Sequence, residues 1–327
     1  MRSQGSITDV PGVEVGHWTD LEGVTGCTVV LCRGGAVAGV DVRGSAPGTY
    51  GTDALAPTAT VQRIHAVLLT GGSAFGLDAV GGVMRWLEER GIGLPVGSVR
   101  VPIVTGAVIF DLNVGRADRR PGPEAGYAAC QAANTGLVAE GSVGAGTGAT
   151  VAKGLGLARA YKGGVGTAAR RLADGVVVGA LVVVNPVGNI VDPASGRLVA
   201  APTDPATGEP VVDPARLLAR RIFPTQNTTI GVVATNVALS KAEAQKLAQM
   251  AHDGLARTIW PVHTAYDGDT MFGLSTGPLR PEWAEVSLLG AVAAELVAAA
   301  VLRAVYLARP LGGIRAVGEE APGQQVP

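Results

Sequence analysis

Residues 224–237 constrain the fold of this chain more than any other stretch. They read PTQNTTIGVVATNV, and from Thr228 onward nearly every residue is β-branched, small or apolar. A run of this kind is typical of a strand that is covered on both faces, as in the interior of a layered α/β structure. The segment therefore predicts a buried strand that begins at Thr228, directly after a loop that ends at Asn227.

Thr228 has two interpretations. Threonine favours β structure, so the residue could simply open the strand. Alternatively, the bond between Asn227 and Thr228 cleaves itself, and Thr228 becomes both a new N-terminus and a nucleophile. A threonine hydroxyl is a weak nucleophile at neutral pH, but a free α-amine on the same residue, with a pKa near roughly 8, can take its proton.

Composition excludes several classes of function. The 327 residues carry 26 Lys and Arg against 27 Asp and Glu without a basic run, so we expect no nucleic-acid partner. The length suits one large domain or two. Glycine occurs 48 times, about twice the usual share of roughly 7%, which indicates many tight turns and close backbone approaches.

Cysteine and histidine are too sparse to form a disulfide framework or a zinc site. The three cysteines form no CxxC motif, which fits a reducing cytoplasm, and we expect no metal and no cofactor. The first residues precede no apolar run, so no signal peptide is expected. The most apolar segment, 286–308, contains Glu295 and Arg303, and it predicts a buried helix rather than a membrane span.

The apolar pattern alternates groups of strands with groups of helices. Apolar runs predict strands at 13–18, 26–32, 36–42, 66–69, 99–110 and 174–184. The pair Gly34-Gly35 predicts a turn between the second and third of these. Helices are predicted at 77–89, 124–133, 214–221 and 282–308, and after a capping box formed by Ser240 and Glu243. This order favours an α/β fold of the four-layer α/β/β/α sandwich type.

Two segments are predicted to lie outside this framework. Residues 192–213 are rich in Pro, Thr, Asp and Gly, which indicates an exposed connector. Residues 310–327 are predicted to form a flexible tail.

Two glycine-rich turns invite familiar interpretations that their residues do not support. Ser73 follows a short strand, but a nucleophile elbow requires glycine two positions later, where Phe75 stands. The run 141–154 is not a Walker A loop, because Ala152 rather than glycine precedes Lys153. We expect the glycines to let the chain pass close to a site into which Lys153 reaches. The alternative is a solvated surface lysine.

Three polar residues stand where strands end or loops begin. Asn185 ends a buried strand before Pro186, where it can form a turn or present an amide donor to a developing oxyanion. Asp267 and Asp269 are two residues apart, so in extended chain both carboxylates face the same side and shift each other's pKa. The ligands that would complete a calcium loop around them are missing. His252 and His263 are expected to be structural.

Five ordered motifs carry a resemblance to a known family. They are residues 12–17, 71–77, 185–188, 227–230 and 267–270, which read GVEVGH, GGSAFGL, NPVG, NTTI and DGDT. The chain from about Asp9 to Leu307 resembles the self-processing N-terminal-nucleophile peptidases typified by L-aminopeptidase/D-esterase and β-peptidyl aminopeptidase. It looks most similar to the branch that hydrolyses 6-aminohexanoate (nylon) oligomers.

The resemblance implies a single hydrolase domain, 1–327, that cuts itself into subunits 1–227 and 228–327 and assembles as a tetramer of cleaved heterodimers. It also assigns roles. Thr228 matches the nucleophile, Asn227 the residue before the scissile bond, and Asn185 a strand-end asparagine near the oxyanion. Lys153 matches a lysine in the active site of the nylon-oligomer hydrolases, and Asp267 and Asp269 match the paired aspartates of that site.

One residue departs from the family pattern. Phe110 stands where the nylon-hydrolase branch has a tyrosine, and it has no hydroxyl to donate. Phe110 is assigned to substrate binding, together with Ser73 and Tyr50, which lies in the polar loop 43–53.

The function expected from the sequence is hydrolysis of amide bonds in short peptides or nylon oligomers. One alternative is a general aminopeptidase/D-esterase acting on small amides and esters. A further alternative is a Gly-rich small-molecule-binding protein without catalysis. No membrane partner is expected.

Overall fold

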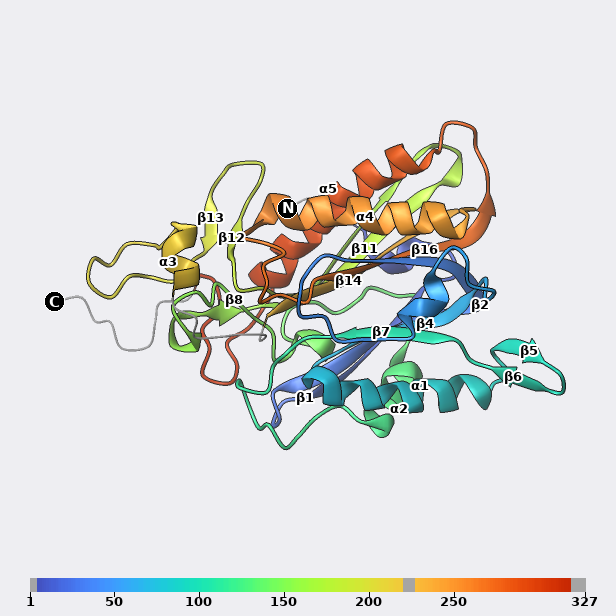
Figure 1. Cartoon of the computed structure of the whole chain (residues 1–327), viewed down its shortest axis with the longest axis horizontal. Helices are drawn as coiled ribbons and strands as arrows, with labels where there is room; N and C mark the ends of the chain where they lie inside the picture. Colours follow the sequence, from blue (N-terminus) through green and yellow to red (C-terminus); the bar gives the residue numbers. More distant parts are fainter. Residues whose placement is uncertain (1–4, 220–226, 319–327) are drawn as a thin grey trace.

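The computed structural model describes residues 5–219 and 227–318, and its long central strands lie between two pairs of helices (Figure 1). The first sheet contains β1 (Glu14–Asp20), the first part of β2 (Thr25–Val42), β4 (Ile64–Thr70), β7 (Val104–Val108) and β3 (Thr49–Tyr50). The second contains β10 (Gly164–Arg171), β11 (Val177–Asn185), β14 (Thr228–Val237), β16 (Thr270–Leu279) and the last part of β2. The long strand β2 therefore joins the two sheets.

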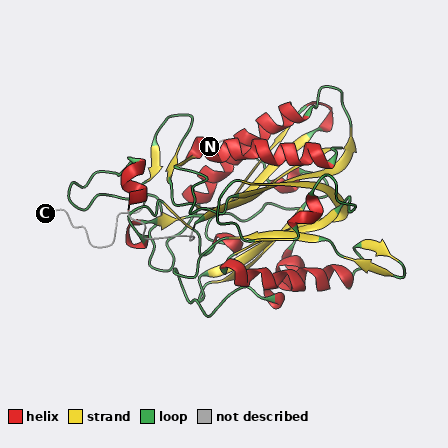
Figure 2. Ribbon diagram, in the orientation of Figure 1, coloured by secondary structure: helices red, strands yellow, loops and turns green. Residues whose placement is uncertain are grey.

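Two pairs of helices cover the outer faces of the sheets. Helices α1 (Ala79–Glu88) and α2 (Pro123–Ala132) lie on the first sheet, and α4 (Lys241–Thr258) and α5 (Val286–Tyr306) lie on the second (Figures 1 and 2). Apolar side chains fill all three interlayer spaces, and Trp86, Leu181 and Leu296 each belong to a different one of these cores. The predicted four-layer α/β/β/α sandwich is confirmed.

Shorter elements connect these layers. The remaining strands are β5 (Leu94–Val96), β6 (Val99–Val101), β8 (Thr150–Val151), β9 (Tyr161–Lys162), β12 (Asn189–Val191), β13 (Leu198–Ala200) and β15 (Ile259–Trp260). The remaining helices are α3 (Pro214–Ala219) and the 3-10 turns η1 (Ile7–Asp9), η2 (Thr52–Leu55), η3 (Ser73–Asp78), η4 (Gly144–Gly146), η5 (Leu157–Arg159) and η6 (Ala173–Gly175).

The turn predicted at Gly34-Gly35 is wrong. The chain does not reverse there but continues through β2, whose pairing with β4 shifts register between Leu31 and Ala36. Gly35 has a φ of +78°, which only glycine adopts readily, so the pair forms a bulge that bends one strand. The bend carries the chain from one sheet to the other.

Two segments predicted to be irregular are more ordered than expected. Within 192–213, β13 pairs with β12, and Val211 is only 2% exposed, so the connector is not uniformly exposed. Residues 310–318 lie against the body of the protein, with Ile314 and Ala316 buried. The rest of the predicted tail, 319–327, and the end of the predicted helix 214–221 lie outside the described residues.

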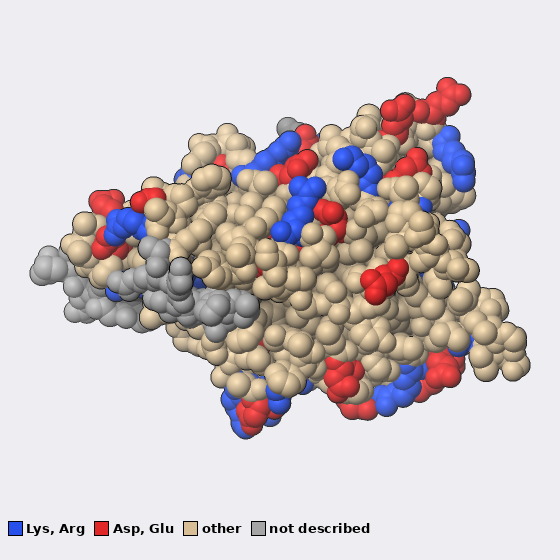
Figure 3. Space-filling model, viewed as in Figure 1, with Lys and Arg blue, Asp and Glu red and all other residues tan. Residues whose placement is uncertain are grey.

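Helix α5 confirms the prediction of a buried helix. It is long and apolar enough to cross a membrane, but 61% of its most apolar window is buried inside the protein, as in the core helix of a globular domain. Helix α4 begins with the predicted capping box, in which Ser240 and Glu243 satisfy each other's backbone N–H groups. On the face drawn in Figure 3, charges of both signs are interspersed.

Candidate active site

The site forms where β14 begins, in the middle of the second sheet. Thr228, the first residue of β14, is paired directly with Asn185, the last residue of β11. On the other side, Asn227 forms a parallel bridge with Asp267, just before β16. Directly paired antiparallel residues have neighbouring side chains on one face. The sheet therefore brings Asn185, Thr228 and the aspartate loop together.

The peptide bond between Asn227 and Thr228 is buried. Thr228 is 5% exposed, and its Oγ1 donates a hydrogen bond to the carbonyl oxygen of Asn227. The same carbonyl accepts a second hydrogen bond from the backbone N–H of Gly268 at 3.0 Å. The hydroxyl oxygen thus lies beside a carbonyl group that a backbone donor already polarises.

The side chain of Asn227 is unsatisfied in this arrangement. Its amide oxygen and nitrogen are both buried and have no hydrogen-bond partner among the described residues. A buried polar group without a partner costs about 1–3 kcal/mol. Two unsatisfied polar atoms therefore lie next to the bond that is predicted to break.

Lys153 approaches the same point from β8. Ala152 has a φ of +57°, a left-handed conformation that is uncommon for a residue with a side chain. Backbone hydrogen bonds from Ala152 to Gly188 and from Lys153 to Val187, each 3.0 Å, hold this turn in place. Lys153 is 3% exposed, so it is not a solvated surface lysine.

The ammonium group of Lys153 is bound to Asn185. Its Nζ donates to the backbone oxygen of Asn185 at 2.8 Å and to the side-chain Oδ1 at 2.9 Å. The Asn185 amide nitrogen donates to the carbonyl of Phe110 at 3.2 Å, and Thr150 N–H donates to Oδ1 at 2.9 Å. Burial lowers the pKa of Lys153 to about 7, although the carboxylate of Asp267 opposes that shift. The group can therefore exchange a proton near neutral pH.

Asp267 and Asp269 are completely buried and their oxygens are occupied by donors. Asp267 accepts from Val187 N–H at 3.3 Å and from the hydroxyl of Thr264 at 2.5 Å. Asp269 accepts from Thr229 N–H at 2.6 Å and from Nδ1 of His263 at 2.8 Å. Burial, and next the negative charge of Asp269, raise the pKa of Asp267 to about 6.

His263, Thr264 and Gly268 are the residues that sequence reasoning missed. His263 was expected to be structural, but it contacts Asp269 directly, and Thr264 holds Asp267. All three belong to the loop that carries the aspartates, and their proximity in sequence is the one signal that could have identified them. Nothing in the sequence indicates that the N–H of Gly268 points at the Asn227 carbonyl.

A second buried pair of charges lies behind the site. Asp111 is 3% exposed and accepts from Gly72 N–H and from the Thr25 hydroxyl, each at 2.7 Å. Lys162 is completely buried and donates to the carbonyl of Thr147 at 2.6 Å. Burial lowers the pKa of Lys162 to about 7, and the charge of Asp111 opposes that shift. This pair fixes the glycine-rich turns around the site.

The residues assigned to substrate binding lie in different places. Phe110 lines a small cleft together with Lys153 and Asn227. Tyr50 and Ser73 do not line that cleft: Tyr50 lies in β3 with 41% of its surface exposed, and Ser73 opens η3. The substrate-binding roles of Tyr50 and Ser73 stay predictions.

The site has the groups needed for proton transfer and acyl transfer. It combines the Thr228 hydroxyl, an amine with a pKa near neutrality, two carboxylates and backbone donors in a buried space. Among residues 5–219 and 227–318, no group of three or more His, Cys, Asp or Glu side chains could hold a metal ion.

Comparisons with known proteins identify the family. The model of peptidase family S58 matches residues 5–317. An uncharacterized aminopeptidase of Mycobacterium tuberculosis is 46% identical over 346 residues, covering 97% of this chain and 98% of the relative. A 6-aminohexanoate-oligomer endohydrolase of Kocuria sp. is 38% identical over 323 residues, covering 93% and 88%.

Solved structures share the fold. A Burkholderia sp. β-aminopeptidase superposes with a TM-score of 0.67 at 25% identity, covering 97% of this chain and 92% of that one. The L-aminopeptidase D-Ala-esterase/amidase of Ochrobactrum anthropi, described as a variant of the Ntn hydrolase fold, has a TM-score of 0.72 at 21% identity, covering 97% and 93%. The chain therefore belongs to peptidase family S58, and it is an amide-hydrolysing enzyme with the N-terminal-nucleophile hydrolase fold.

Proposed function

We propose that this protein cuts its own chain between Asn227 and Thr228 and then hydrolyses small amides with Thr228 as an N-terminal nucleophile. The observation that carries the proposal is the contact between the Thr228 hydroxyl and the Asn227 carbonyl, whose oxygen also accepts from Gly268 N–H at 3.0 Å. The products are the subunits 1–227 and 228–327.

In the first stage, Oγ1 of Thr228 attacks the carbonyl carbon of Asn227. Neutral Lys153 takes the hydroxyl proton, and the N–H of Gly268 stabilises the oxyanion. The carbon–nitrogen bond then breaks, the proton passes to the leaving nitrogen, and an ester joins Asn227 to Thr228. Water hydrolyses the ester, which leaves a carboxylate on Asn227 and a free amine and hydroxyl on Thr228.

The unsatisfied side chain of Asn227 supports this direction of reaction. Its buried amide groups have no partner among the described residues while the bond is intact. Cleavage frees the new C-terminus to move, so these groups can reach water. Relief of this cost favours the cut chain.

In the second stage, mature Thr228 acts on a substrate amide. Its own α-amine accepts the hydroxyl proton and later donates it to the leaving amine, while Asn185 and Lys153 stabilise the oxyanion. Asp267 and Asp269 orient and charge-balance the new ammonium group, since Asp269 already binds the neighbouring N–H of Thr229 at 2.6 Å. Because Phe110 carries no hydroxyl, Asn185 and Lys153 have no phenolic donor from that position to assist them.

The substrates are short peptides or ω-amino-acid oligomers. The names of the relatives support both classes, because one is called an aminopeptidase and another a 6-aminohexanoate-oligomer endohydrolase. The second candidate is a general aminopeptidase/D-esterase on small amides and esters, since a structural relative carries that activity in its name.

The test is replacement of Thr228. Thr228→Ala removes the hydroxyl that serves both stages, so we expect an uncut chain and a loss of amide hydrolysis of roughly a thousandfold or more. Thr228→Ser keeps the oxygen and should still cut itself, at a reduced rate. N-terminal sequencing and intact mass reveal the cut, and chromogenic amino-acid anilides report the activity.

Thr229→Val is the matched control. It removes a neighbouring hydroxyl that is buried and has no hydrogen-bond partner in the described structure, so it should leave cleavage and turnover near parent levels. A folded Thr228→Ala enzyme that hydrolyses anilides at close to the parent rate would contradict the assignment of Thr228 as the nucleophile. Ser73 or Ser142 would then be tested next.

We also propose a homotetramer of cleaved heterodimers in the cytoplasm. The hairpin β5–β6 projects from the body and exposes apolar side chains, with Val96 51% and Val99 57% exposed, as expected of a subunit contact (Figure 1). The cysteines Cys27, Cys32 and Cys130 are free thiols, which fits a reducing compartment. Light scattering of the purified protein gives the oligomeric state.

A further inference from the structure

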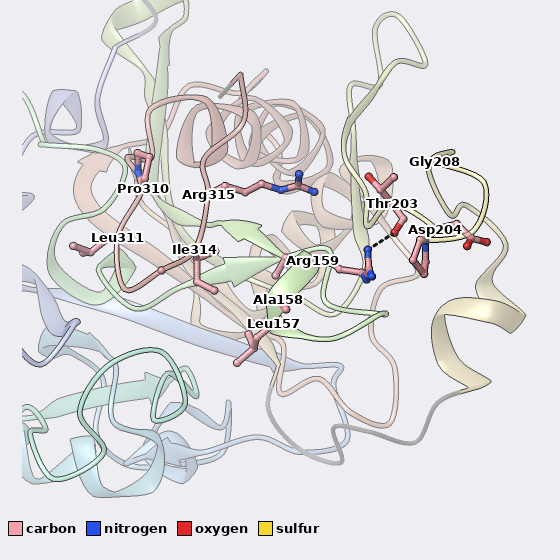
Figure 4. A pocket seen from close by; sticks show the side chains of 13 residues that line it. Leu157, Ala158, Arg159, Thr203, Asp204, Gly208, Pro310, Leu311, Ile314 and Arg315 are labelled. Atoms are coloured by element: carbon pink, nitrogen blue, oxygen red, sulfur yellow. Dashed lines mark hydrogen bonds between the residues drawn. The ribbon is translucent and has the colours of Figure 1, made fainter. Parts of the chain in front are cut away.

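A cavity next to the active-site cleft has no assigned role. It has a volume of about 650 Å³, within the roughly 300–1,000 Å³ typical of ligand pockets. Its walls come from η5, from the loop 203–208 and from the chain after α5, between residues 310 and 315 (Figure 4). The walls include two arginines, Arg159 and Arg315.

Arg315 is held in place but unsatisfied. Its guanidinium lies 4.1 Å from the centre of the Tyr161 ring, which orients it. A backbone bond of 2.7 Å from Lys162 to the carbonyl of Arg315 fixes the chain at this point. The guanidinium has no hydrogen bond or ion pair within 5–219 and 227–318, and its Nε is buried without a partner. Its positive charge is therefore uncompensated.

Arg159 supplies the second positive charge. It donates one hydrogen bond, from Nη1 to the carbonyl of Thr203 at 3.2 Å, and it forms no ion pair in the part of the chain that the structure describes. In Figure 4 its guanidinium and that of Arg315 both extend toward Thr203. The one acidic lining residue, Asp204, is already paired with Arg216. The lining thus carries two positive charges that no carboxylate within 5–219 and 227–318 neutralises.

The cavity adjoins the small cleft at the scissile bond. Leu157 lines both the cavity and the small cleft that contains Lys153 and Asn227. Leu157 thus stands between the two spaces, so a substrate whose reacting amide lies at Thr228 would reach the cavity on the far side of this one side chain. The walls on this path include Leu311 and Ile314, which favour an apolar chain.

We propose that this cavity binds the terminal carboxylate of the substrate, and that Arg159 and Arg315 select substrates with a free carboxyl end. The inference rests on the proposed function of Thr228. In any linear peptide or amino-acid oligomer, the free carboxylate belongs to the part that leaves as an amine. The cavity is thus the leaving-group side of the site.

The chemistry of the lining favours a carboxylate. Guanidinium groups bind carboxylates through paired, charge-assisted hydrogen bonds, which are among the strongest that proteins form. A neutral amide or ester end offers no charge and leaves both arginines uncompensated. A short chain with apolar side chains or methylene groups and one carboxylate matches both the walls and the charges.

The test compares two substrates that differ only at that end. The self-cleaved enzyme is given trialanine with a free carboxylate and trialanine amide, and release of alanine is measured as kcat/KM. We expect the parent enzyme to prefer the free acid by about tenfold or more. Arg159→Gln and Arg315→Gln should each lower kcat/KM for the free acid by about tenfold and leave the amide within about twofold.

Arg171→Gln is the control, because Arg171 is an exposed arginine of β10 that does not line the cavity. It should change neither substrate. Equal kcat/KM for the two substrates in the parent, or equal losses for both in the arginine variants, would overturn the inference.

A binding measurement separates this inference from the proposed function. Calorimetry with dialanine and dialanine amide, the two leaving groups, measures their binding to the cavity in the absence of hydrolysis of the tripeptides. Tighter binding of dialanine that is lost in Arg315→Gln supports carboxylate recognition, and equal binding of the two overturns it. A parent chain that stays uncut and hydrolyses neither tripeptide overturns the proposed function instead.

Discussion

Lys153 is the residue whose charge should control self-cleavage. Burial lowers its pKa to about 7, so its amine is mostly protonated below that pH and mostly neutral above it. Only the neutral amine can accept the Thr228 proton. The rate of cleavage should therefore rise about tenfold per pH unit below about 7 and level off above it.

This prediction can be followed on precursor made by cell-free synthesis and transferred to buffers between pH 5 and 9. Lys153→Arg keeps the positive charge but cannot become neutral, so it should cut far more slowly at every pH. A rate that is flat across this range in the parent protein would show that Lys153 is not the base.

At the level of single residues, the sequence could locate the main groups but not their supports. Asn185, Thr228 and Asp267 end or precede strands in regular patterns, and neighbouring strands bring such positions together. The support from His263 and Gly268 depends on how one loop folds back on the site. Loop conformation is set by tertiary contacts, so no local pattern could reveal it.

At the level of elements, glycine indicates close approach of the backbone but does not by itself distinguish a turn from a bulge. The sequence predicts a turn at Gly34-Gly35, because a glycine pair between two apolar runs has the same pattern in a hairpin and in a bulged strand. The partner strands decide between the two. Here β16 pairs with the last part of β2 and keeps the chain extended.

The close approach of α4 to the second sheet gives a stability prediction. Gly39 in β2 pairs with Gly273 in β16, and a Cβ at Gly39 would lie 2.2 Å from the backbone nitrogen of Gln245 in α4. Gly39→Ala should therefore push α4 away and lower the free energy of unfolding by roughly 1–3 kcal/mol. Urea denaturation measures the change.

Gly81 provides the contrasting case. It lies in α1, and a Cβ there would meet nothing within 4 Å. Gly81→Ala should raise the free energy of unfolding by roughly 0.5–1 kcal/mol, because alanine favours the helix. If Gly39→Ala changes the free energy of unfolding by the same amount and in the same direction as Gly81→Ala, the packing of α4 is not what requires glycine at position 39.

At the level of the whole molecule, the four layers could be predicted because long apolar runs mark their strands and helices. The surroundings of the cavity could not. Residues 310–318 have little apolar pattern, yet they lie against β9 through the bridge between Tyr161 and Arg315. Such an arrangement depends on contacts between distant parts of the chain.

The position of β14 predicts how the cleaved protein behaves. Although the cut at Asn227 separates two polypeptides, β14 lies between β11 and β16, hydrogen-bonded to both, and α5 covers β10 and β11. Subunit 228–327 thus contributes central strands and both helices of one layer, and its removal would expose two apolar cores.

We expect the two fragments to elute together in size-exclusion chromatography and to separate only in the same range of urea that unfolds the protein. Circular dichroism and native mass spectrometry on the same urea series compare the two transitions. A fragment 228–327 that elutes alone without denaturant would contradict the interleaved sheet.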